Sequence, residues 1–275
     1  MTMAPKPFII IAGPCLLESW EIGEEVAREL VEIRREHPDI RLIFKASVDK
    51  ANRSSVHGNR GPGFREGLVL LAELKNRFKF EVTTDFHGPD QAEMAAEVCD
   101  VLQVPAFLCR QTDMLAAAAR TGRAVSVKKG QFLSPWDMVH VVEKLRAFGA
   151  TEIFQMERGT SFGYGNLVVD MRGFQVMAAN GCPVIYDLTH SLQLPGRGDS
   201  ATAGAREFAD TLARAAIGAG IDGLFLETHP HPEISLCDRE TQLPLKTLAG
   251  RIHKYLTLQE MQNTCKMQNY VKRNS

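Results

Sequence analysis

The sequence alternates short apolar segments with longer amphipathic ones, and this alternation constrains the possible folds more than any other feature. Short runs rich in Val, Ile, Leu and Phe predict strands, while apolar residues repeating every three or four positions predict helices. The strands are expected at residues 8–12, 41–46, 80–85, 101–104, 124–127, 152–156, 183–187 and 223–227. The helices are expected at residues 18–36, 63–77, 89–97, 111–121, 134–147, 166–179, 206–219 and 245–261.

Strands that alternate with helices imply a parallel sheet in an α/β protein. Eight such units without a linker-like break predict a single (β/α)8 TIM barrel that spans residues 1–275 as one catalytic domain. An open, doubly wound sheet is the alternative architecture. The last segment, residues 262–275, is polar and is expected to be a frayed tail.

Charge and cysteine usage narrow the class of protein. Lys and Arg total 32 against 33 Asp and Glu. A nucleic-acid-binding protein usually has a basic surplus, so nothing in this balance indicates nucleic acid as a partner. The apolar run at residues 8–12 is too short for a membrane span or the core of a signal peptide. Six cysteines form no CxxC pair, so reduced thiols in a cytoplasmic protein are expected.

One loop concentrates polar chemistry directly after the second predicted strand. The stretch FKASVDKANRSS, residues 44–55, brings Lys45, Lys50 and Arg53 within nine residues and adds Asn52 and Ser54. Cations and hydroxyl groups at the end of a strand suit a phosphate or a carboxylate. A charge run can also be an ordinary solvated loop, but the interleaved Asn and Ser residues favour an anion site.

Polar residues also follow each of the remaining predicted strands. In a barrel the carboxyl ends of the strands form one face, and active sites lie there. The expected mouth therefore collects Cys15, Lys45, Asp85, His87, Gln103, Arg110, Lys128, Lys129, Glu157, Arg158, Asp187, His190, Glu227, His229 and Asp238. Single members such as Asp85, Gln103 and Asp187 could instead be hydrogen-bonded core residues.

Two groups within this set point to chemistry. Six cations around one mouth would repel one another unless anions bind among them, which predicts two phosphorylated substrates, or one phosphate and a carboxylate. They are Lys45, Lys50, Arg53, Arg110, Lys128 and Arg158. The second group combines a thiol, an imidazole and two carboxylates, the usual ligands of a divalent transition metal. Its members are Cys15, His190, Glu227 and Asp238, although no local spacing links them, and Cys15 alone could be a buried small apolar residue.

Seven motifs together resemble one enzyme family over most of the chain, from about Ile10 to Leu245. They are IAGPC, FKASVDKANRSS, PAFLCRQTD, VKKGQFLSPWD, ERGTSFGYGNLVVDMR, YDLTHSLQLPG and LETHPHPE. The chain resembles the 3-deoxy-D-manno-octulosonate 8-phosphate synthases. The resemblance implies a transferase that condenses phosphoenolpyruvate with D-arabinose 5-phosphate and water for lipopolysaccharide precursor synthesis. It also implies a (β/α)8 barrel and a homotetramer.

The resemblance also implies roles for individual residues. Phosphoenolpyruvate would be held by Lys45, Lys50, Gln103, Lys128 and Arg158, and Ala106 would be a further substrate-binding residue. Arabinose 5-phosphate would be held by Asn52, Arg53 and Ser54, with Arg110 reaching its phosphate from a neighbouring subunit. The residues expected to take part in catalysis are Lys50, Asn52, His190 and Asp238.

Cys15 marks the metal-requiring branch of this family, because the metal-free branch has Asn at that position. The expected ligands are Cys15, His190, Glu227 and Asp238, with Mn, Fe, Co or Zn as the metal. His231 stands where relatives usually have an acidic residue, and no role is assigned to it.

Three other functions compete with this interpretation. A related synthase uses erythrose 4-phosphate, but its loop resembles KPRTS rather than KANRSS. A Schiff-base aldolase on the same fold would use Lys128 or Lys45 as its nucleophile, and borohydride would trap its covalent adduct. A regulator that only binds sugar phosphates would release no phosphate from phosphoenolpyruvate.

Overall fold

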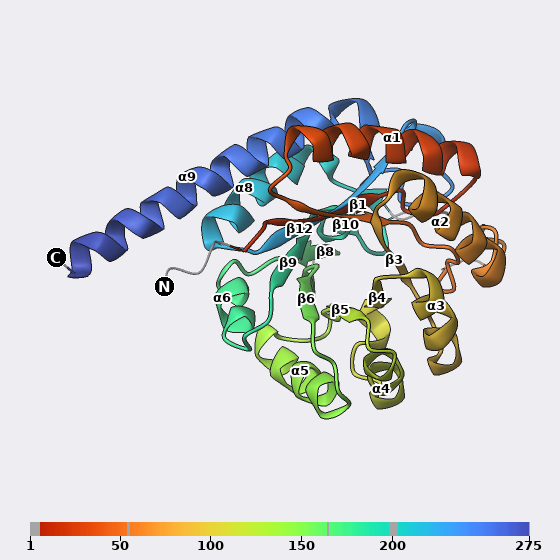
Figure 1. Ribbon diagram of the computed structural model, residues 1–275, viewed down its shortest axis with the longest axis horizontal. Helices are drawn as coiled ribbons and strands as arrows, with labels where there is room; N and C mark the ends of the chain where they lie inside the picture. The colour runs from red at the N-terminus through yellow and green to blue at the C-terminus, as the bar shows by residue number, and fades with distance from the viewer. Residues whose placement is uncertain (1–5, 54–55, 164, 198–202, 275) are drawn as a thin grey trace.

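Eight parallel strands form a closed ring with helices around it (Figure 1). The computed structural model describes residues 6–53, 56–163, 165–197 and 203–274, with side chains described through residue 264. The ring consists of β1 (Ile9–Gly13), β2 (Arg41–Lys45), β3 (Glu81–Asp85), β4 (Val101–Val104), β5 (Ala124–Lys128), β6 (Ile153–Glu157), β9 (Val184–Asp187) and β12 (Gly223–His229).

The pairing of the first strand with the last closes the ring. Ile11 of β1 lies opposite Ile43 of β2 on one side and opposite Phe225 of β12 on the other. An open sheet would leave two strands with an unpaired edge, whereas β1 and β12 pair with each other. The predicted (β/α)8 barrel is confirmed, and the doubly wound alternative is wrong.

Helices cover the outside of the barrel in sequence order (Figure 1). They are α1 (Trp20–Glu36), α2 (Phe64–Phe78), α3 (Ala92–Val98), α4 (Thr112–Arg120), α5 (Met138–Ala147), α6 (Arg172–Ala178), α8 (Ala209–Ala219) and α9 (Leu248–Asn274). A three-residue 3-10 turn precedes α3, α5, α8 and α9, which accounts for the earlier starts predicted for these helices. Helix α9 continues past the predicted end at residue 261 and projects beyond the ring (Figure 1).

Alternating strand residues build two separate apolar layers. On β1, Ile9 and Ile11 belong to the cluster inside the barrel, whereas Ile10 and Ala12 pack in the larger cluster beneath the helices. Both faces of the strands are therefore buried, which is why they are continuous apolar runs in the sequence. The inner cluster fills the barrel below its mouth and also contains Phe225.

The amino end of the barrel is closed by a charged cluster around Arg41. Its guanidinium binds Glu81 at 2.8 Å and Glu152 at 2.5 Å. The same group lies 5.4 Å from the ring centroid of Phe154 in the inner cluster. Arg41 and the two glutamates thus pair with one another at this end, and the candidate active site lies at the opposite end of the barrel.

The predicted helix at residues 166–179 is only partly correct. Strands β7 (Thr160–Phe162) and β8 (Asn166–Val168) form an antiparallel hairpin, and the helix begins at Arg172. Only Leu167 of β8 is buried while its neighbours are exposed, a strand period of two. Asp170 then accepts a hydrogen bond from the Arg172 backbone amide at 3.0 Å and so sets the helix start.

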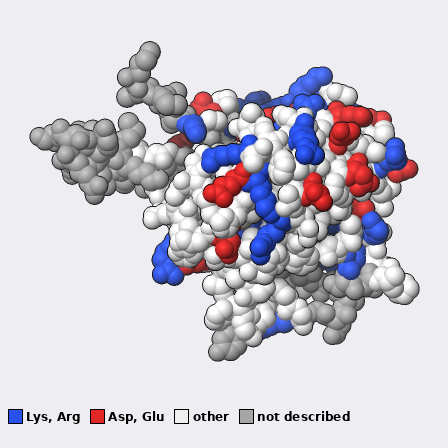
Figure 2. All heavy atoms as spheres, turned by 90° about the horizontal axis from the view of Figure 1, so that it is seen from below, with Lys and Arg blue, Asp and Glu red and all other residues white. Residues whose placement is uncertain are grey.

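Further short elements interrupt the loops. Strands β10 (Gln193–Leu194) and β11 (Ala203–Gly204) pair in the segment between β9 and α8, of which residues 198–202 lie outside the described part. The helical turn α7 (Leu188–Ser191) follows β9, and β13 (Leu243–Pro244) pairs with β12. On the face drawn in Figure 2, acidic and basic residues are intermixed. Among the described residues, no helix has the length and apolar character to cross a membrane.

Gly13 provides a test of the packing at the mouth. A Cβ at this position would overlap the Lys45 carbonyl oxygen, whereas a Cβ at Gly218 in α8 would meet nothing within 4 Å. We expect Gly13→Ala to lower the free energy of unfolding by about 2–3 kcal/mol, because backbone must shift. The matched variant Gly218→Ala should raise it by about 0.5–1 kcal/mol, because alanine has the better helix propensity. Urea unfolding of both proteins checks the opposite signs, and equal effects would contradict the close approach at Gly13.

Candidate active site

The carboxyl ends of the strands form a mouth lined by buried polar side chains. Four of them are the last residues of their strands. Lys45 ends β2, Asp85 ends β3, Lys128 ends β5 and Asp187 ends β9. All four side chains are almost completely buried. The predicted convergence of strand-end residues is thus present in the structure, while the roles assigned to them stay predictions.

Lys45 and Glu227 form a buried ion pair across the mouth. Lys45 Nζ lies 2.5 Å from Glu227 Oε1 and also donates to the carbonyl oxygens of Pro14 and Cys15. Burial by itself would raise the pKa of Glu227. His190 and the nearby lysines outweigh that effect and hold its pKa well below the ordinary value. Glu227 therefore stays ionised inside the barrel.

A second buried cluster joins β5 to β9. Lys128 Nζ donates to Asp187 Oδ2 at 2.6 Å and lies 3.2 Å from His190 Nδ1. Asp187 Oδ1 lies 3.0 Å from the same imidazole nitrogen and accepts the His190 backbone amide. Burial lowers the pKa of Lys128, while Asp187 and Glu227 oppose that shift. Asp187 thereby orients both the lysine and the histidine.

Arg158 keeps hydrogen-bonding capacity for a further partner. Its Nη2 donates to Gln193 Oε1 at 2.5 Å and to the His190 carbonyl oxygen at 3.4 Å. Its Nη1 is buried and has no hydrogen-bond partner, and the same is true of Gln103 Oε1. Lys50 Nζ contacts Ser47 Oγ at 3.0 Å. A buried, unpartnered guanidinium nitrogen is a natural donor to an anionic ligand.

Among the residues of the loop after β2 that are predicted to hold the sugar phosphate, the two that the structure describes are less buried than the lysines that end β2 and β5. Asn52 is exposed, and Arg53 donates to the carbonyl oxygens of Asn59 and Leu236. Ser54 lies outside the described residues. Ala106 is half-buried in the 3-10 turn Ala106–Leu108 after β4.

Arg110 is exposed and lies apart from the buried clusters of the mouth. It lines a pocket of about 250 Å3 with residues of the loop after β5 and of α5, among them Phe132, Asp137 and Lys144. The six predicted cations thus do not form one set within a single chain. Four of them line the mouth, and Arg53 and Arg110 lie outside it.

Carboxylates modify the expected repulsion among the cations. Lys45 pairs with Glu227, and Lys128 pairs with Asp187. These carboxylates lie next to the lysines only in the closed barrel, so they reduce the repulsion expected from the sequence. Anionic ligands are therefore not required to hold the lysines in place, although unpartnered donors remain.

The four predicted metal ligands meet at one corner of the mouth, in two overlapping groups. Cys15, Cys237 and Asp238 form one group, and His190, Glu227 and Asp238 form the other. Within each group the potential ligand atoms lie within 4.8 Å of one another. Cys15 Sγ lies 3.1 Å from Asp238 Oδ2. A thiol, an imidazole and carboxylates fit a divalent transition metal better than Mg2+.

Two further observations agree with a metal at this corner. Glu227 Oε2 is buried without a hydrogen-bond partner, so one ligand oxygen is free. Asp238 has a left-handed backbone with φ of 47°, and Gln193 Nε2 donates to its Oδ1 at 2.9 Å.

Burial raises the pKa of the Cys15 thiol well above its ordinary value, and neighbouring Cys237 adds to the effect. Metal binding would therefore have to displace a proton from this thiol.

Sequence reasoning assigned no role to two residues that the structure brings into the site. Cys237 directly precedes Asp238, and the Cys-Asp pair was the available signal. Asp187 was treated as either a core or a site residue, and it contacts both Lys128 and His190. The pair Asp85 and His87, with 3.2 Å between Oδ2 and Nε2, also lies at a strand end, and each residue keeps one buried unpartnered atom.

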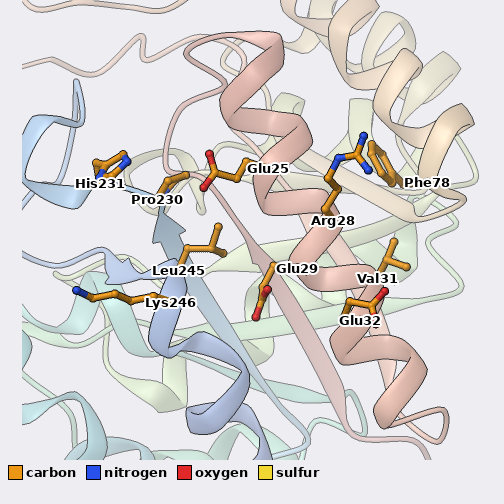
Figure 3. Close-up of a pocket in the computed structure, with 10 residues that line it drawn as sticks. All are labelled: Glu25, Arg28, Glu29, Val31, Glu32, Phe78, Pro230, His231, Leu245 and Lys246. Atoms are coloured by element: carbon orange, nitrogen blue, oxygen red, sulfur yellow. The ribbon is translucent and has the colours of Figure 1, made fainter.

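A larger groove lies elsewhere, on the outer flank of the barrel (Figure 3). It measures about 650 Å3 and runs between α1 and the segments around Pro230 and Leu245. Charges of both signs line it, including Glu29, Arg28 and Lys246. Among the predicted site residues that the structure describes, none lines this groove. The buried ionic clusters, rather than this groove, identify the candidate active site.

A closed barrel with paired lysines and a candidate metal group at its mouth defines a (β/α)8-barrel enzyme. The chain belongs to the DAHP synthetase I family, whose model matches residues 4–265. It is 51% identical to the 2-dehydro-3-deoxyphosphooctonate aldolase of Desulfotalea psychrophila over 87% of this chain and 85% of that protein. It is 52% identical to the protein of the same name from Pelobacter propionicus, over 89% of this chain and 90% of the relative. That name is a synonym of the synthase family predicted from the motifs, so the resemblance is confirmed.

The buried pair of Lys45 and Glu227 generates a stability prediction. Glu227→Gln should lower the free energy of unfolding by about 3–5 kcal/mol, because Lys45 would remain buried and unpaired. The control is Glu32→Gln on α1, where Arg35 and Glu32 are 71% and 56% exposed and the expected loss is about 0–1 kcal/mol. Urea unfolding compares the two. The double variant Lys45→Met/Glu227→Gln should recover part of the loss, and a double variant less stable than Glu227→Gln would contradict the pairing.

Proposed function

We propose that this protein condenses phosphoenolpyruvate with D-arabinose 5-phosphate and water to form 3-deoxy-D-manno-octulosonate 8-phosphate and inorganic phosphate. The product would be a precursor of lipopolysaccharide. The names of relatives that are about half identical over most of their length support this reaction. The structural observation that carries the proposal is the buried, unpartnered Nη1 of Arg158 among buried lysines. Such a donor favours an anionic acceptor.

Phosphoenolpyruvate offers a phosphate and a carboxylate to this mouth. Its proposed binding residues surround the buried ion pairs, and they are Lys45, Lys50, Gln103, Ala106, Lys128 and Arg158. The lysines supply charge, and the guanidinium of Arg158 supplies directional donors. Burial strengthens each of these interactions, because little water remains to compete.

The loop after β2 is proposed to hold arabinose 5-phosphate through Asn52, Arg53 and Ser54. Arg110 is proposed to reach the sugar phosphate of a neighbouring subunit in a homotetramer. Its exposed position supports that role, as do three exposed aromatic residues, one of which, Phe132, lines the same pocket as Arg110. Phe107, Phe132 and Trp136 are 54%, 58% and 61% exposed, and apolar surface of this kind is typical of interfaces.

In the proposed reaction, C3 of phosphoenolpyruvate attacks the aldehyde carbon of the sugar phosphate, and water captures the positive charge at C2. Collapse of that adduct breaks the bond between C2 and the phosphate oxygen and releases inorganic phosphate. The lysines and Arg158 hold phosphoenolpyruvate beside the sugar phosphate bound by the loop after β2, which supplies proximity and electrostatic stabilisation. Lys50, Asn52, His190 and Asp238 are the proposed catalytic residues, and Asp187 holds the His190 imidazole in one orientation.

Cys15, His190, Glu227 and Asp238 are proposed to hold a divalent transition metal, with Mn, Fe, Co and Zn as candidates. When bound, such an ion supplies Lewis-acid polarisation to an oxygen atom of substrate or water. The described cysteines are free thiols, which supports a reducing, cytoplasmic location. We also propose that residues 1–275 act as one catalytic domain, with the end of α9 in place of the frayed tail expected at residues 262–275.

Substrate choice distinguishes this reaction from that of the related synthase. Arabinose 5-phosphate should be turned over far faster than erythrose 4-phosphate, because Asn52 and Ser54 can hydrogen-bond the additional sugar hydroxyl. Sites built to bind a hydroxyl reject analogues that lack it by large factors. Phosphate release from phosphoenolpyruvate with a panel of aldose phosphates measures this preference. Equal turnover of the two sugars would overturn the assignment.

Arg110 should act on the sugar phosphate alone. Arg110→Ala is expected to raise KM for arabinose 5-phosphate by roughly tenfold to a hundredfold, because a charge-assisted hydrogen bond worth about 1.5–3 kcal/mol is lost. KM for phosphoenolpyruvate should change little. Steady-state kinetics with each substrate varied in turn measures both constants, and Arg35→Ala on exposed α1 is the control.

The same variant tests whether Arg110 serves a neighbouring subunit. Arg110→Ala and Lys128→Ala proteins should each have low activity, and subunits exchanged between them should regain some activity through mixed sites. Light scattering of the wild type would establish the oligomer first. A monomer, or mixed oligomers without any regain, would contradict the shared site.

Removal of the metal should abolish activity reversibly. Dialysis against a strong chelator is expected to inactivate the wild type, and Mn, Fe, Co or Zn should restore it. Cys15→Ala should lose bound metal and activity together, as measured by elemental analysis and phosphate release. Cys15→Asn imitates the metal-free branch and is expected to keep some chelator-resistant activity. A metal-free wild type at full rate would leave Cys15 as a packing residue.

A further inference from the structure

We propose that Phe225 is a positioning residue whose ring, at the centre of the barrel, holds the ammonium groups of Lys128 and Lys45 in place for anion binding. The inference rests on the proposed function only in taking these two lysines as ligands of phosphoenolpyruvate.

Phe225 lies directly beneath the mouth. It is on β12, two residues before Glu227, so both side chains point to the same face of the strand. It belongs to the apolar cluster inside the barrel and is fully buried. Its neighbours in the sheet are Ile11 of β1 and Asp187 of β9. The ring is therefore the boundary between the apolar interior and the ionic layer above it.

Three site residues contact this one ring. Lys128 Nζ lies 3.8 Å from the ring centroid, and Lys45 Nζ lies 5.5 Å from it. The His190 ring centroid lies 5.6 Å away. The negative face of an aromatic ring attracts cations, most strongly where water is excluded. Both ammonium groups meet that condition, since both lysines are at most 5% exposed.

The ring stabilises the cations without adding a negative charge. Lys128 already has Asp187 and Lys45 already has Glu227 as carboxylate partners. A further carboxylate would repel an incoming phosphate or carboxylate ligand, whereas a neutral ring does not. A Leu side chain would fill much of the volume but would offer no attraction to an ammonium group. The aromatic character of residue 225 thus matters for ligand binding.

The barrel contains a matched control for this ring. Phe154 on β6 is also fully buried in the inner cluster. Its cation partner is Arg41, at the amino end and away from the mouth. A change of packing in the inner cluster should affect both rings, but of the two only the Phe225 ring contacts Lys45 and Lys128.

The experiment replaces each ring by 3,4,5-trifluorophenylalanine, at position 225 or at position 154, in the full-length enzyme. Fluorination keeps the shape of the ring and weakens its negative face. Titration calorimetry then measures the Kd of phosphoenolpyruvate in the absence of the sugar phosphate. We expect binding to weaken roughly tenfold with the substitution at 225, within the range of a desolvated cation–π contact, and to stay unchanged with the substitution at 154.

Steady-state kinetics and the Phe→Leu variants complete the test. Phe225→Leu should raise KM for phosphoenolpyruvate more than it lowers kcat, and Phe154→Leu should leave that KM unchanged. Unchanged Kd with the fluorinated ring at 225, or equal weakening at 225 and 154, would overturn the inference while leaving the proposed function intact. A wild type that does not bind phosphoenolpyruvate would overturn the proposed function, and this inference with it.

Discussion

The pairing of β1 with β12 is the interaction on which the rest of the structure depends. It joins the two ends of an eight-stranded parallel sheet and removes the edges that an open sheet would expose. Closure also turns the strand ends into a ring, so residues distant in the chain become neighbours. The Cys15 backbone amide, for example, donates to Gln242 at 3.0 Å. The candidate active site is a direct consequence of this geometry.

Once the ring is closed, its charged residues must be compatible with burial. A buried charge is tolerated only when it is paired or hydrogen-bonded. Lys45 and Lys128 each have a carboxylate on one side, and the Phe225 ring lies near both ammonium groups. The carboxylates stay ionised because the cations outweigh the effect of burial on their pKa values. The same arrangement leaves Arg158 Nη1 without a hydrogen-bond partner. The same set of residues therefore serves both stability and ligand binding.

Local patterns predicted some elements better than others for identifiable reasons. The barrel strands are buried on both faces, so each is a short apolar run that sequence reasoning places well. The helix predicted at 166–179 starts too early because Leu167 and Val168 also fit a helical period. Pairing of Val168 with Thr160 places them in a strand instead. The turn that leads into α5 does carry a local signal, because the Ser134 hydroxyl donates to the Asp137 carboxylate at 2.8 Å. Elements that depend on a distant partner, such as β10 and β11, carry little local signal.

The eight βα units, the polar residue at each strand end and the motifs of the family could be predicted from the amino-acid order, because they depend on residue type and local spacing. The pairing of charges could not, since Lys45 and Glu227 are brought together by closure of the barrel. The tertiary structure also decided that Cys237 joins Cys15 and Asp238, and that one ring lies beneath two lysines. Contacts of this kind join residues on different strands, and no periodicity along a single strand encodes them.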